Sequence, residues 1–62
     1  MIISVSYEDG VNETSGYRIE EMKGGYHIKV DRQFRQQTGV VPLLQRALHE
    51  IFVRERRIVN GH

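Results

Sequence analysis

The sequence predicts a small α+β domain of order β-β-β-α: a three-stranded antiparallel sheet with one C-terminal amphipathic helix packed on one face. Three observations lead to this prediction. Residues 2–7 alternate in polarity, a glycine pair separates two further alternating segments, and residues 42–57 carry apolar side chains at helical spacing. A chain of 62 residues has room for one core, so we expect residues 1–62 to form a single domain.

The first strand is expected at residues 2–7, where Ile3, Val5 and Tyr7 share one face. Neither a charge nor a proline interrupts this segment, and a sheet edge that lacks such guards is open to pairing with another strand. In a three-strand meander the segment lies at an edge. We therefore expect a second copy of the chain, or a strand of another protein, to cover it. The alternative is that residues 58–59 fold back over the edge.

The glycine pair at 24–25 predicts a two-residue hairpin turn between the second and third strands. Counting outward from this turn places opposite charges across from one another on one face, in the pairs Glu20–Lys29 and Arg18–Asp31. The other face then carries the apolar side chains of Tyr17, Ile19, Ile28 and Val30. A slip of one residue would exchange the two faces, so the apolar pattern fixes which side is buried.

Residues 32–41 allow two interpretations. Asp31 is a suitable N-cap for a short helical turn over residues 32–37, with Gly39 ending it. The segment is alternatively an extended connection, because Val40 and Val41 favour a strand and the residue before Pro42 avoids helical geometry. We favour the short helical turn.

The C-terminal helix is expected over residues 42–57, with Pro42 in the first turn, where its missing N–H has no intrahelical partner. Six apolar side chains fall within one arc of this helix and are expected to face the sheet: Leu43, Leu44, Ala47, Leu48, Ile51 and Phe52. Glu55 falls in the same arc, where an unpaired carboxylate is costly. We therefore expect tight packing to end near Phe52 or Val53.

Enzyme motifs are scarce in this chain. His49-Glu50 begins like the zinc motif H-E-x-x-H, but Val53 stands where the second histidine is required. Glu20 and Glu21 are neighbours in a strand and so point to opposite faces, which separates the two carboxylates. We expect no enzymatic activity, no cofactor and no metal site.

Composition narrows the setting and the partner. The chain has no cysteine, which favours the cytoplasm over a secreted disulfide framework, and its apolar runs are too short to span a bilayer. The net charge of +1 is unevenly distributed. Residues 1–22 carry five acidic side chains and one basic, whereas residues 23–62 carry eight basic and three acidic. A basic half favours nucleic acid as a partner, or charge complementarity between two parts of one molecule or between two copies.

The main functional hypothesis is a non-enzymatic protein-binding module, a dimer that regulates, inhibits or adapts a macromolecular partner. Its partner-binding residues are expected at the strand edge and on the outer helix face: Ile3, Val5, Tyr7, Arg46, His49, Val53 and Arg57. The alternative is a nucleic-acid-binding protein with a phosphate-contacting patch on its C-terminal half, formed by Arg32, Arg35, Arg46, Arg56 and Arg57.

Overall fold

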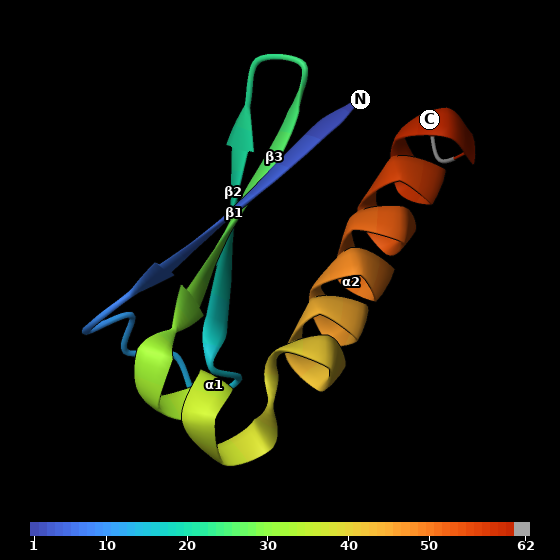
Figure 1. The fold of residues 1–62 in the computed structure, drawn as a ribbon. Coiled ribbons are helices and arrows are strands. Elements are labelled where there is room, and N and C mark those ends of the chain that lie inside the picture. The colour runs from blue at the N-terminus through green and yellow to red at the C-terminus, as the bar shows by residue number, and fades with distance from the viewer. Residues whose placement is uncertain (61–62) are drawn as a thin grey trace.

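The computed structural model describes the fold of residues 1–60, and the surroundings of the side chains as far as residue 56. In chain order the elements are β1 (Ile2–Glu8), β2 (Tyr17–Met22), β3 (Gly25–Asp31), α1 (Arg32–Thr38) and α2 (Val40–Asn60). The long helix α2 runs along one face of the sheet, and α1 follows directly from the end of β3 (Figure 1). The predicted α+β architecture, with a three-stranded sheet and a C-terminal helix, is therefore confirmed.

The sheet is mixed, so the prediction of a purely antiparallel sheet is wrong. Its strand order is β1-β3-β2, with β1 parallel and β2 antiparallel to the central strand β3. The connection over residues 9–16 is longer than a tight hairpin turn, and it carries the chain past the end of β3. The central position suits β3, because its inward side chains Tyr26, Ile28 and Val30 are the most deeply buried of the sheet.

The predicted hairpin exists, but its register is wrong by two residues. Met22 lies opposite Gly25, so the two turn residues are Lys23 and Gly24, and Gly24 takes a φ of 84°. Gly25 is a strand residue because β1 passes directly over it: a Cβ at this position would collide with the carbonyl oxygen of Ile2. A shift of two residues keeps the two faces of each strand, and the predicted apolar face is therefore confirmed.

One of the two predicted charge pairs survives the shift. The Lys29 ammonium lies 3.2 Å from the Glu20 carboxylate, although the residue directly opposite Glu20 is His27. The Arg18 guanidinium instead lies 3.2 Å from the Glu13 carboxylate in the preceding connection. The predicted Arg18–Asp31 pair is absent, because the register places Lys29 opposite Arg18.

Residues 32–38 form the short helix α1, which confirms the interpretation that we favoured. The Asp31 carboxylate caps it by accepting a hydrogen bond of 2.9 Å from the Gln33 N–H. At the other end Gly39, with a φ of 90°, donates its N–H to the Arg35 carbonyl, a conformation that glycine adopts easily. The sequence therefore encoded both ends of this helix.

Helix α2 is longer than predicted and packs on the sheet with only part of its apolar arc. It includes residues 58–59, which continue the helix rather than folding back over β1. The core formed by β2, β3 and α2 consists of Tyr17, Tyr26, Ile28, Val30, Leu43, Ala47 and Ile51. The expectation that Leu48 and Phe52 belong to it is wrong, because both side chains are exposed. In the described part of the chain, no helix has the length and apolar character needed to cross a membrane.

Candidate protein-binding surface

The two flanks of α2 differ in chemistry. The flank on the β1 side is apolar: Leu48 and Phe52 line a hollow together with Met1 and Ile3. The flank on the β2 side is polar, and its Glu50 carboxylate accepts a hydrogen bond of 2.5 Å from the Tyr17 hydroxyl. Because α2 lies over β2 and β3, its apolar flank borders the uncovered inner side of β1.

The inner face of β1 is half open as a consequence. The parallel register sets Ile3 beside Tyr26 and Val5 beside Ile28, so these side chains share one face of the sheet. Tyr26 and Ile28 are buried under α2, whereas Ile3 is 38% and Val5 is 39% exposed. We call this surface the open apolar face and define it by Met1, Ile3, Val5, Leu48 and Phe52.

Phe52 is the most prominent side chain that α2 contributes to the open apolar face, with 67% of its surface exposed. The hollow beside it has a volume of about 110 Å³, is lined also by Ile51, and has Glu55 as its single charged residue. Small-molecule pockets usually measure about 300–1,000 Å³ and hold several polar groups. The hollow therefore fits one apolar side chain better than it fits a metabolite.

One edge of the sheet presents free backbone groups beside this face. The Ile2 N–H donates to the Gly24 carbonyl at 2.9 Å, which shows that the even-numbered residues of β1 bond to β3. Successive residues of a strand direct their backbone groups to opposite edges. The N–H and C=O groups of Ile3, Val5 and Tyr7 therefore lie along the free edge of β1.

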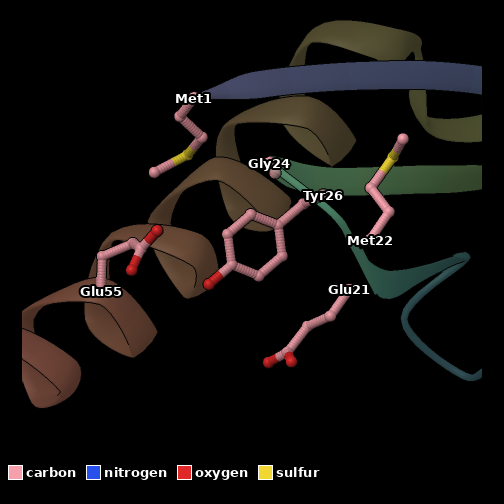
Figure 2. A pocket seen from close by; sticks show the side chains of 7 residues that line it. Met1, Glu21, Met22, Gly24, Tyr26 and Glu55 are labelled. Carbon is pink, nitrogen blue, oxygen red and sulfur yellow. The ribbon is translucent and has the colours of Figure 1, made fainter.

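Glu55 lies where the apolar flank of α2 reaches the start of β1. Figure 2 shows its carboxylate and that of Glu21 on either side of the Tyr26 hydroxyl, with Met1 close by. Burial raises the pKa of Tyr26 above its ordinary value of 10.0, and the negative charges of Glu55 and Glu21 raise it further. Glu55 is half-buried, in agreement with the expectation that tight apolar packing ends just before it.

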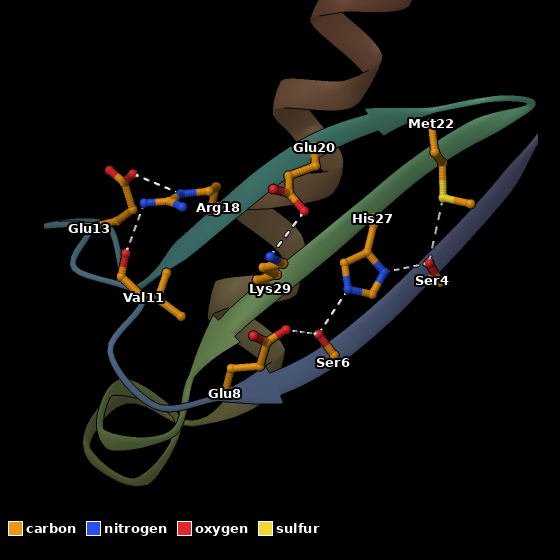
Figure 3. Close-up of polar contacts among 10 residues, drawn as sticks. All are labelled: Ser4, Ser6, Glu8, Val11, Glu13, Arg18, Glu20, Met22, His27 and Lys29. Atoms are coloured by element: carbon orange, nitrogen blue, oxygen red, sulfur yellow. Dashed lines mark hydrogen bonds and ion pairs between the residues drawn. The ribbon is translucent and has the colours of Figure 1, made fainter.

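The opposite face of the sheet carries a chain of polar contacts centred on His27 (Figure 3). Its Nδ1 lies 2.6 Å from the Ser4 hydroxyl and its Nε2 lies 2.8 Å from the Ser6 hydroxyl. Ser6 donates to the Glu8 carboxylate at 2.7 Å, so its oxygen accepts from the Nε2–H of His27. The Ser4 hydroxyl lies between His27 Nδ1 and the Met22 sulfur, which is 3.9 Å away. His27 therefore ties β1 to β3 across their parallel register.

The residues predicted to bind a partner lie on two surfaces rather than one. Ile3 and Val5 belong to the open apolar face, and Tyr7 lies beside it, half-buried, with the Arg35 guanidinium 4.5 Å above its ring. Arg46 and His49 lie on the other flank of α2, where they line a shallow hollow with Tyr17. Of the two remaining predicted residues, Val53 is half-buried, and Arg57 is helical with its side chain outside the described part.

The residues of the predicted nucleic-acid patch are dispersed. On α1, Arg32 lies 3.6 Å from the Asp9 carboxylate, and Arg35 stacks on Tyr7. Both arginines therefore already have partners within the chain. Arg46 and Arg56 are exposed on α2 but about 15 Å apart along its axis, at ~1.5 Å per residue. These arginines do not form one compact patch in the described structure.

Sequence reasoning assigned Leu48 and Phe52 to the core, although the width of the apolar arc contained a warning. At 100° per residue the six apolar positions span about 180°, whereas a core-facing stripe needs roughly 100°. The surplus indicates a second apolar contact.

Comparison of the chain with family models, curated proteins and solved structures gave no match.

Proposed function

We propose that the chain is a small non-enzymatic protein-binding module that regulates, inhibits or adapts a macromolecular partner. The observation that carries this proposal is the open apolar face, where Phe52, Ile3 and Val5 are exposed next to an unpaired strand edge. Contiguous apolar surface beside free backbone groups is typical of a surface that another protein covers. The absence of cysteine from the sequence supports action in the cytoplasm.

The predicted contacts on the other flank of α2, namely Arg46, His49, Val53 and Arg57, remain part of the proposal as a second surface. Arg46 and His49 are exposed, and Arg46 is free of any ion pair within 4.0 Å among the described side chains. Charges at the rim of an interface chiefly steer association and select the partner. This second surface would therefore select the macromolecular partner.

Nucleic-acid binding is the competing function, and the exposure of Arg46 and Arg56 on α2 is the observation that favours it. An arginine patch that contacts phosphates would give binding that weakens steeply with salt, and each lost contact would reduce the salt slope by about one. An apolar protein interface would show a much smaller salt dependence. Fluorescence anisotropy of mixed-sequence DNA and RNA probes at two salt concentrations separates the two functions.

The direct test compares the proteins that immobilised variants retain from a nuclease-treated lysate of the organism that encodes the chain. Phe52→Glu places a charge on the open apolar face, and Thr14→Glu places the same charge on an exposed loop. We expect the wild type and Thr14→Glu to retain the same proteins and Phe52→Glu to lose them. Equal retention by all three proteins, or retention from an untreated lysate that is lost after nuclease treatment, would overturn the proposal.

A further inference from the structure

We infer that the open apolar face is occupied by a second copy of this chain, with the two β1 strands paired antiparallel about a two-fold axis at Val5. This inference rests on the proposed protein-binding function and identifies one partner of that same surface. The result is a six-stranded sheet with both α2 helices on one side, a size that is ordinary for sheets of globular proteins.

The backbone of β1 fixes the register of this pairing. The free N–H and C=O groups belong to Ile3, Val5 and Tyr7, because Ile2 bonds in the other direction, to Gly24. In antiparallel pairs, residues that face each other with free groups exchange two hydrogen bonds. A two-fold axis at Val5 pairs Val5 with the partner's Val5, and Ile3 with the partner's Tyr7. All the free groups of these three residues are then satisfied.

Charge also favours β1 over the other edge of the sheet. Residues 2–7 contain no charged side chain, so antiparallel self-pairing brings no like charges together there. The opposite edge strand, β2, carries Arg18, Glu20 and Glu21, all of them exposed. Exposed charges are the usual means by which proteins protect an edge from pairing. Only one of the two edges is therefore open to a second strand.

A second copy supplies the wall that the hollow lacks. A two-fold axis perpendicular to the sheet places both helices above the same face, each one over its own β2 and β3. The two β1 strands then lie side by side beneath the gap between the helices. The register sets Ile3 of one copy opposite Tyr7 of the partner subunit, so the partner's strand adds apolar surface beside the hollow that Leu48 and Phe52 line.

This self-complementarity distinguishes a second copy from an added peptide strand. A peptide that pairs with β1 covers the backbone groups of the edge but leaves Phe52 and Leu48 on α2 without a partner. A second copy brings a strand together with the side chains of its own open apolar face, and the same residues form both sides, as a two-fold interface requires. Stable interfaces bury about 800 Å² per partner. An interface of that size would cover about one sixth of the 4631 Å² surface of this chain.

Cysteine cross-linking at the axis tests the pairing, because the natural chain contains no cysteine. Paired residues that exchange hydrogen bonds have Cα atoms about 5.5 Å apart, within the range of about 4.4–6.8 Å that a disulfide spans. We expect purified Val5→Cys to form a disulfide-linked dimer under mild oxidation, at least ten times faster than Thr14→Cys at equal concentration. The circular dichroism spectrum of the linked species should match that of the wild type.

Mass measurements on variants complete the test. In sedimentation velocity, His49→Glu should remain a dimer and Phe52→Glu should become a monomer, because only Phe52 lies on the open apolar face. Equal cross-linking rates for Val5→Cys and Thr14→Cys would overturn the inference. If the chain is then monomeric while Phe52→Glu still loses proteins from the lysate, the proposed function stands and the partner is a different protein. If the chain is monomeric and Phe52→Glu also retains every protein that the wild type retains, the inferred dimer and the proposed function both fail.

Discussion

Ile3 of β1 and Phe52 of α2 line the same hollow, yet Ile3 is 38% and Phe52 67% exposed to solvent. The strand and the helix meet at this point without closing over each other, because α2 is centred over β2 and β3. On the other side of the helix, Tyr17 and Glu50 close the equivalent gap with a hydrogen bond. A hydrogen bond therefore joins the helix to the sheet on the β2 side, whereas apolar side chains line the β1 side.

Leu43→Ala should destabilise the fold strongly, because Leu43 is among the largest fully buried side chains. Truncation of a buried leucine costs about 2–5 kcal/mol, which is a large share of the stability of a small domain. Val41→Ala, on the exposed first turn of the same helix, should cost less than about 0.5 kcal/mol. Urea denaturation at one fixed protein concentration measures both values. Equal losses would show that α2 packs with a different face.

Tyr17→Phe should reveal the hydrogen bond that joins β2 to α2. Burial, followed by the Glu50 carboxylate, raises the pKa of Tyr17 from 10.0 to about 12. A raised folded-state pKa means that the hydroxyl contributes its full stability below pH 10 and loses it as the pH rises towards 12. Thermal unfolding from pH 8 to pH 12 should therefore give the wild type a higher Tm than Tyr17→Phe at pH 8. This difference in Tm should shrink above pH 10. A gap that does not change with pH would exclude the bond.

Gly25→Ala should be more damaging than Gly24→Ala, although the two glycines are adjacent. A Cβ at residue 25 collides with the backbone of Ile2, so β1 must move away from β3. At residue 24 the Cβ meets no neighbour, and the cost is the strain of a positive φ, about 1–2 kcal/mol. Hydrogen exchange should show β1 amides losing protection in Gly25→Ala alone. Similar effects of both substitutions would favour a turn at residues 24–25.

Reversing the charges of Arg46 and Arg57 should weaken capture of the macromolecular partner without dissociating the dimer. Arg46 is exposed on the flank of α2 that lies away from β1, and Arg57 follows it by about three helical turns. Steering by rim charges acts mainly on the association rate. Partner capture and sedimentation of the Arg46→Glu, Arg57→Glu double variant measure the two effects separately. Unchanged capture would remove this surface from the proposed site.

Local signals in the sequence predicted the local features of the fold. Asp31 and Gly39 fixed both ends of α1, and the alternation around Ile28 identified the buried face of the hairpin. The pairing of β1 with β3 was not predictable in this way, because it depends on residues far apart in the chain. The turn position was missed for a related reason: Gly25 is needed beside Ile2, a contact that no local pattern displays.

The candidate site was predicted only in part. The uncharged strand at residues 2–7 identified the exposed edge correctly. Leu48 and Phe52 were assigned to the core because apolar spacing on a helix does not reveal how far the sheet beneath it extends. The structure separates them from Leu43, Ala47 and Ile51, the three α2 side chains that are buried against the sheet. The second set of predicted residues, around Arg46, lies on the opposite flank, because helical spacing alone does not show which flank borders β1.

Sedimentation equilibrium of the wild-type chain over a wide concentration range is the most direct test of the central claim. The open apolar face predicts a reversible increase in mass from 7.3 kDa to twice that value as the concentration rises. The transition should change little between low and high salt, because residues 2–7, which form the paired strands, carry no charged side chain. A constant mass of 7.3 kDa up to millimolar concentration would contradict self-association through this face.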